Sequence, residues 1–222
     1  MVKAIIQSIL GLAAFAAFWF GLAGRLGWWQ GWILLIVFTL LVAGFAWRLA
    51  STDPGLLRER NRPGGDVPVW DRWIMRVYTL MLVVQLAVSA LDSGRFRWSQ
   101  VPWGVQLLGW CLIVGSAFAI WRVTASNPYL SSWARLQDDR DQVVVQDGPY
   151  AIIRHPMYSA IAGAFLGMPL ALASWWSLVP AMVNIGLFVY RTHREDEMLK
   201  RGLPGYEAYA QSVRYKLIPG VW

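Results

Sequence analysis

Residues 26–47 read LGWWQGWILLIVFTLLVAGFAW, a run of 22 residues without a charged side chain. Tryptophans stand near both of its ends, and most of the residues between them are apolar. The hydrocarbon core of a bilayer is about 30 Å thick, and roughly 20 apolar residues of helix cross it. Tryptophan is enriched where such a helix meets the headgroups. The run therefore predicts a transmembrane helix and an integral membrane protein.

Other runs have the same character. Ala4–Gly24 and Trp98–Trp121 are each long enough for one span, and Val77–Leu91 becomes long enough when Trp73–Met75 are added. Together with the longer run described next, they predict an all-α fold. We expect a polytopic transmembrane helical bundle of about six spans.

The last apolar run, Pro156–Tyr190, has 35 residues without a charge. We expect it to fold at Ser174-Trp175-Trp176 into a helical hairpin of two short spans. Beyond it, Thr192–Arg201 is predicted to form a charged helix. Tyr206–Val213 spaces its apolar residues three or four apart, which is typical of an amphipathic surface helix.

The composition excludes several classes of protein. The chain is 57% hydrophobic and only 15% charged, whereas soluble domains average about 25% charged residues. It has no Gly-x-Gly-x-x-Gly and no Walker loop, which argues against a Rossmann-type nucleotide-binding domain. With two histidines and one cysteine, we expect no metal site, and we interpret Cys111 as a small residue of the apolar core.

The basic residues predict the orientation. Of the 20 Lys and Arg residues, all but Arg25, Arg95 and Arg97 fall in the termini and in the linkers after the second and fourth spans. Positive residues mark the cytoplasmic side, so both termini are predicted to be cytoplasmic. The net charge of +7 then suits a membrane protein facing anionic lipid, and no nucleic-acid partner is expected. In a bacterial source, the membrane would be the plasma membrane.

The stretch richest in possible chemistry is Gly148–Tyr158, which reads GPYAIIRHPMY. It stands where a polar linker enters the fifth span, and Pro156 suits the first turn of a helix. Arg154 and His155 would lie at the mouth of that span, with Tyr158 just inside it.

The other arm of the hairpin ends in Arg191-Thr192-His193-Arg194-Glu195-Asp196. Arg191 and Glu195 are four residues apart and share a helix face. Because a hairpin brings its ends together, these side chains can converge with Arg154, His155 and Tyr158 into a ligand site. The alternative is that the arginines are juxtamembrane anchors and the acidic residues a solvated face.

The pattern Gly-Pro-Tyr, Arg-His-Pro-x-Tyr and then Arg-x-x-x-Glu-Asp resembles the isoprenylcysteine carboxyl methyltransferase superfamily. That superfamily also includes phospholipid N-methyltransferases. The resemblance is specific from about Val143 to Trp222, and the N-terminal half is similar only as a set of spans. Asp196 departs from the pattern, because the best-known members carry a second Glu at this position.

The resemblance implies a methyltransferase that uses S-adenosylmethionine and releases S-adenosylhomocysteine. In such enzymes two arginines hold the acceptor, which here implies Arg154 and Arg191 as the catalytic pair. The cofactor-binding residues that it implies are Val145, Tyr150, His155, Pro156, Tyr158, Glu195 and Asp196.

The acceptor is expected to be lipophilic and to enter from the membrane, with an isoprenoid or lipid carboxylate as the first candidate. A phospholipid amine and a small thiol are the alternatives. A transporter or another non-enzymatic membrane protein that retains the scaffold is the competing hypothesis. We divide the chain into a four-span N-terminal region, 1–124, and a catalytic region, 125–222.

Overall fold

The computed structural model describes residues 2–52, 54–56 and 67–222, with side chains from Leu10 onward. No β-strand occurs in those ranges, so the predicted all-α fold is confirmed. Lys3, Arg58, Arg60 and Arg62, counted above among the basic residues of one side, lie outside the part whose side chains are described. The α-helices are α1 (Val2–Ala23), α2 (Trp29–Thr52), α4 (Val69–Ser89), α5 (Trp103–Ser126), α6 (Pro156–Ala171), α7 (Leu178–Gly202) and α8 (Tyr206–Ser212).

Three helical segments are long and apolar enough to cross a membrane: α2, α5, and α4 together with the π-helical turn η1 (Ala90–Phe96) that continues it. Leu10–Ala23 of α1 and the whole of α6 are shorter apolar helices. Each apolar run of the sequence is therefore helical. The predicted hairpin also forms, and its turn lies between α6 and α7.

The second arm of this hairpin differs from the prediction. We expected a span ending at Tyr190 and a separate charged helix from Thr192, but α7 runs without a break from Leu178 to Gly202. No glycine or proline lies between Tyr190 and Arg201, so nothing interrupts the helical hydrogen bonds there. One rigid helix thus connects the apolar hairpin to the acidic residues of the motif.

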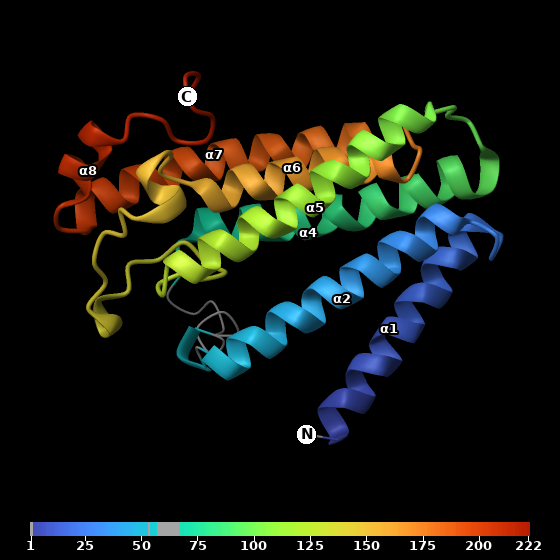
Figure 1. Cartoon of the computed structure of the whole chain (residues 1–222), viewed down its shortest axis with the longest axis horizontal. Helices are drawn as coiled ribbons and strands as arrows, with labels where there is room; N and C mark the ends of the chain where they lie inside the picture. Colours follow the sequence, from blue (N-terminus) through green and yellow to red (C-terminus); the bar gives the residue numbers. More distant parts are fainter. Residues whose placement is uncertain (1, 53, 57–66) are drawn as a thin grey trace.

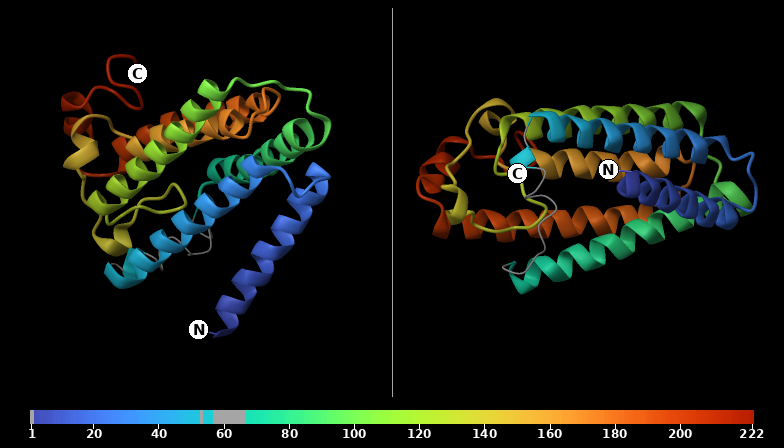
Figure 2. Two further views of the ribbon diagram at one scale, coloured as in Figure 1. Left: turned by 45° about the vertical axis from the view of Figure 1, so that its right-hand side comes forward. Right: turned by 90° about the horizontal axis from the view of Figure 1, so that it is seen from below.

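The helices α4, α5, α6 and α7 run side by side, α2 lies along one side of them, and α1 meets them near the α1–α2 connection and slants away toward the N-terminus (Figures 1 and 2). We call the end that carries α8 and the loop 127–155 the site end. The opposite end, the far end, carries the connections 24–28, 97–102 and 172–177 (Figure 1).

Helices α5 and α6 pack with their backbones in contact. A Cβ built on Gly109 would lie 2.3 Å from the Ala171 nitrogen, and one on Gly167 would lie 2.8 Å from the Gly109 oxygen. On Gly163 it would lie 2.7 Å from the Ser116 hydroxyl. Small residues let membrane helices approach closely, so Gly163 and Gly167 are packing residues.

Asp92 fastens the far end. It is fully buried in η1 and accepts hydrogen bonds from the Ser99 amide at 2.8 Å and the Ser99 hydroxyl at 2.6 Å. The Ser174 hydroxyl donates to the same carboxylate at 2.6 Å. One carboxylate therefore joins the α4–α5 connection to the α6–α7 turn.

The expectation for Cys111 is wrong, because its side chain is exposed on the outside of α5. In a bilayer, the lipid-facing surface of a helix is as apolar as its packed face. Apolar character alone therefore could not place this residue in the core.

Candidate functional site

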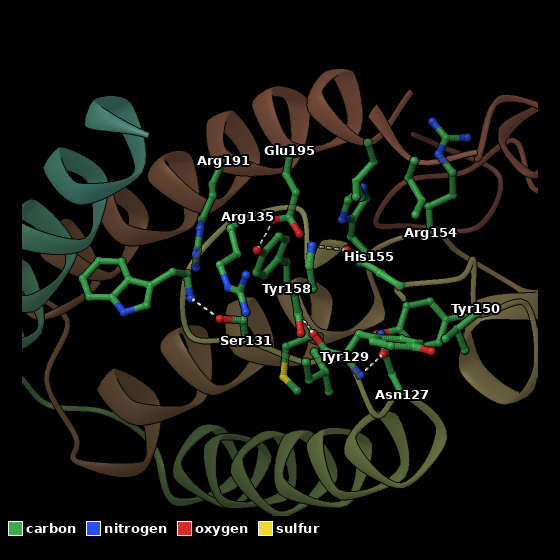
Figure 3. Close-up of a pocket in the computed structure, with 18 of the residues that line it drawn as sticks. Asn127, Tyr129, Ser131, Arg135, Tyr150, Arg154, His155, Tyr158, Arg191 and Glu195 are labelled. Carbon is green, nitrogen blue, oxygen red and sulfur yellow. Dashed lines mark hydrogen bonds between the residues drawn. The ribbon is translucent and has the colours of Figure 1, made fainter. Parts of the chain in front are cut away.

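A cavity of about 320 Å³ lies at the site end. Its walls come from α4, α6 and α7 (Figure 3), and residues of the loop 127–147 and of α8 complete its lining. The volume falls at the lower end of the range of roughly 300–1,000 Å³ that is usual for small-molecule sites. The cavity is apolar toward the bundle, where Met75, Tyr78, Ile161 and Phe188 line it, and polar toward the loop.

The structure brings most of the predicted site residues together. Pro156 and Asp196 are the two that do not line the cavity. Pro156 begins α6, as expected for a proline in the first turn. The predicted residues that do line it are Val145, Tyr150, Arg154, His155, Tyr158, Arg191 and Glu195.

Tyr158 and Glu195 form the centre of this arrangement. The Tyr158 hydroxyl donates a hydrogen bond to the Glu195 carboxylate, from α6 to α7 (Figure 3). The His155 ring stacks on the Tyr158 ring with 5.7 Å between centroids and 5° between planes. On its other side, the Arg191 guanidinium lies 5.3 Å from the centroid of Tyr158. Glu195 forms no ion pair within the described part of the chain.

Arg191 has an acidic partner that the sequence analysis missed. Its Nε lies 2.7 Å from Asp71 Oδ1, and its Nη2 lies 3.2 Å from Asp71 Oδ2. Nη2 also donates to the Ser132 carbonyl at 3.0 Å, while the Ala134 amide donates to Asp71 at 2.9 Å. Asp71 is fully buried in the first turn of α4. The pair therefore connects α4, α7 and the loop that covers the cavity.

Two sequence features pointed toward Asp71. It is an acidic residue two positions before the predicted third span, near the helix start, where the positive end of the helix dipole favours it. An acid at the start of an apolar helix also needs a partner if it becomes buried. Neither feature identifies a partner 120 positions away.

Asp196 faces away from the cavity, into a buried ionic cluster. It accepts from Arg154 Nε at 2.8 Å and from the Tyr206 hydroxyl at 3.0 Å. The Nζ atoms of Lys200 and Lys216 each lie 3.4 Å from it. Burial alone would raise the pKa of Asp196. Hydrogen bonds from His155 and Arg154, with their charges, outweigh burial and hold that pKa well below its usual range.

Arg154 binds the C-terminal segment. Its Nη1 donates to the carbonyls of Ala210 at 3.2 Å, Val213 at 2.6 Å and Arg214 at 2.9 Å. Its other nitrogens bind Asp196. In Figure 3 the Arg154 guanidinium points away from Tyr158 and Glu195. Each of its nitrogens already donates within the protein.

Tyr150 lies on the loop side of the cavity. Its hydroxyl accepts from Asn127 Nδ2 at 2.8 Å, and its carbonyl accepts from the Tyr209 hydroxyl at 2.7 Å. Burial raises the pKa of Tyr150 above its ordinary value, so its hydroxyl stays protonated at neutral pH. Asn127 also lines the cavity, and the sequence analysis did not name it.

Fold and site together define an apolar helical membrane protein with a carboxylate- and aromatic-lined cavity at one end of its bundle. Residues 105–204 match the family model described as phospholipid methyltransferase, and this segment is a phospholipid methyltransferase domain, of the family shared with the isoprenylcysteine carboxyl methyltransferases. The predicted resemblance is thereby confirmed. A search of curated proteins gave no match. The domain includes most of α5 and so begins before residue 125, where we placed the catalytic region.

Proposed function

We propose that this protein transfers a methyl group from S-adenosylmethionine to a lipophilic acceptor at the membrane surface. One observation carries the proposal. Within the phospholipid methyltransferase domain, the Glu195 carboxylate and the Tyr158 ring face the cavity, and Glu195 forms no ion pair among the described residues. A carboxylate beside aromatic faces suits a cationic ligand.

The residues present fit this donor. S-adenosylmethionine combines a sulfonium cation with an adenosine and a methionine part. The cavity offers Glu195 for positive charge, the ring of Tyr150 for stacking, and the side-chain nitrogens of Asn127 and Gln142 as hydrogen-bond donors. Val143, Val144 and Val145 give it an apolar side. When bound, the donor supplies a methyl group activated by the sulfonium.

We assign the residues around it as follows. Glu195 holds positive charge, and Tyr158 fixes the Glu195 carboxylate through its hydroxyl. His155 packs behind Tyr158 and keeps its ring in place. Tyr150 and Val145 form the loop side of the donor site. Their shared task is to align the reactants and to exclude water.

The two predicted catalytic arginines have different assignments. Arg191 is the acceptor-facing residue, because its Nη1 makes no hydrogen bond among the described residues and its side chain lines the cavity. Arg154 is a positioning residue that fixes the C-terminal segment. Asp196 acts with Arg154 and does not touch the donor.

This assignment changes the argument about the acceptor. Two uncompensated arginines would favour an anionic acceptor, but Asp71 balances the charge of Arg191 and Asp196 balances that of Arg154. In the neutralised Asp71–Arg191 pair, Nη1 of Arg191 remains to donate a hydrogen bond to the methyl acceptor. We therefore propose a lipophilic acceptor whose polar atom reaches Arg191 from the apolar end of the cavity, with carboxylate, amine and thiol all retained as candidates.

We also propose that the site end is cytoplasmic. Of the 16 Lys and Arg residues whose side chains the structure describes, all but Arg25, Arg95 and Arg97 lie in the site-end halves of the helices or in the connections and C-terminal segment there, which is the positive-inside distribution.

Purified protein incubated with methyl-labelled S-adenosylmethionine and a membrane lipid extract tests the activity. We expect label in an organic-soluble product, and we expect Glu195→Gln to abolish it. Glu207→Gln serves as the matched control, since Glu207 is exposed on α8. No labelled product from folded protein with any extract fraction would contradict the proposal.

A further inference from the structure

The far end carries the three basic residues that break the positive-inside distribution: Arg25, Arg95 and Arg97. Arg25 follows α1, whereas Arg95 and Arg97 lie in and just after η1. The two segments meet, because a Cβ built on Gly24 would lie 3.5 Å from the Arg95 side chain. We call these residues the far-end arginines.

The far-end arginines have no acidic partner in the described ranges. The acid nearest in sequence, Asp92, is turned inward and accepts from Ser99 and Ser174. Arg25 donates to the carbonyls of Gly94 at 2.6 Å and Ser93 at 3.1 Å, which leaves its charge uncompensated. Burial lowers the pKa of Arg25, and the nearby charge of Arg97 lowers it further. Like charges held together in this way favour a bound anion.

A groove of about 460 Å³ begins at Arg25 and follows α1. It is open to the outside, small residues form its floor, and two stacked rings, with centroids 4.3 Å apart, form one wall. Besides Arg25, the groove residues are Ala16, Ala17, Phe20, Gly21, Gly24, Leu26 and Trp32. An apolar groove that opens onto cationic groups at the end of a membrane helix has the two parts that an acyl chain and a headgroup phosphate require.

We propose that this groove and the far-end arginines bind an anionic phospholipid. One acyl chain lies along Ala16, Ala17 and Gly21, and the phosphate meets Arg25, with Arg95 and Arg97 beside it. The site is separate from the cavity at the site end and does not depend on the proposed methyl transfer.

Native mass spectrometry of the full-length protein in detergent, titrated with phosphatidylglycerol or with phosphatidylcholine of the same chains, tests the proposal. We expect tighter binding of phosphatidylglycerol. The double variant Arg95→Gln/Arg97→Gln should weaken phosphatidylglycerol binding by roughly 25-fold and leave phosphatidylcholine binding unchanged, since each basic residue near anionic lipid contributes on the order of a fivefold change. Both arginines are exposed, so the fold tolerates the change.

Gly21→Leu tests the groove itself. Nothing lies within 4 Å of a Cβ at Gly21, so the larger side chain fits and fills the groove. We expect this variant to weaken the binding of both lipids severalfold. Gly11→Leu is the matched control, because Gly11 is exposed on the same helix, has the same open surroundings and is not a groove residue.

Arg122→Gln/Arg201→Gln is the matched charge control, with both residues exposed near the site end. Equal binding of the two lipids would overturn the proposal. A phosphatidylglycerol preference that survives Arg95→Gln/Arg97→Gln would also overturn it. So would an equal loss of that preference in the charge control, because the lipid would then be attracted by the net charge of the protein and not by the far-end arginines.

Discussion

Asp71 Oδ1 lies 2.7 Å from Arg191 Nε, and this contact joins the start of α4 to the methyltransferase domain. Both side chains are buried, and Arg191 lines the cavity, so its pairing with Asp71 fixes this part of the cavity wall. Asp71 lies outside the matched residues, and the N-terminal half therefore contributes directly to the candidate site.

Replacing Asp71 by Asn should destabilise the protein by about 3 kcal/mol, because it leaves the buried Arg191 charge without a counterion. The thermal unfolding midpoint measures this loss. The double variant Asp71→Asn/Arg191→Gln should lose at least about 1 kcal/mol less stability than the sum of the losses in the two single variants. Additive losses would show that the two residues are not coupled.

Arg191→Lys separates acceptor alignment from donor binding. Lysine keeps the charge but cannot bind Asp71 in a bidentate manner while also reaching the Ser132 carbonyl. We expect methyl transfer to fall at least about tenfold and S-adenosylhomocysteine affinity to change less than about threefold. Arg194→Lys, on the exposed side of the same helix, should leave both unchanged. If Arg191→Lys instead lost affinity for S-adenosylhomocysteine, Arg191 would have to be assigned to the donor site and not to the acceptor.

The Asp196 cluster predicts a specific dependence of stability on pH. Because the pKa of Asp196 is lowered in the folded protein, its contribution is present above the unfolded-state pKa of about 3.9 and is lost as the pH falls toward the folded-state pKa. The stability difference between wild type and Asp196→Asn should therefore be constant from about pH 5 to 8 and narrow below about pH 4. A difference that widens in acid would show that the carboxylate is not held in its charged form.

Gly109→Ala tests the close packing of α5 on α6. The added methyl would meet the backbone of Ala171, and we expect a loss of about 1–3 kcal/mol from this overpacking. Gly115→Ala, also on α5, meets nothing within 4 Å and should cost nothing. Equal unfolding midpoints for the two variants would contradict the arrangement of these helices.

The local parts of this structure could be predicted from the sequence. Uncharged runs marked the helices, and the motif from Tyr150 to Tyr158 marked the cavity, since each property lies within one short segment. The continuity of α7 could also be predicted from the sequence, because no glycine or proline between Tyr190 and Arg201 interrupts a helix. Our prediction divided this segment where the charged residues begin and so placed a helix end that does not exist.

The remaining parts depend on tertiary contacts. Asp71 meets Arg191 only after α4 and α7 pack together, so no local pattern reveals the pair. The sequence predicted Arg154 and Asp196 as ligand-binding residues, but in the structure both bind residues of the C-terminal segment. The motif gave the right neighbourhood, and only the fold distinguishes residues that face the cavity from those that support it.

The central claim is a donor site built on Glu195. Calorimetric titration of the detergent-purified protein with S-adenosylhomocysteine tests it most directly, with Glu195→Gln as the test variant and Glu207→Gln as the control. We predict saturable one-site binding in wild type and Glu207→Gln, weakened at least about tenfold in Glu195→Gln. Folded wild-type protein that binds no S-adenosylhomocysteine, or Glu195→Gln that binds it as tightly as wild type, would contradict the account.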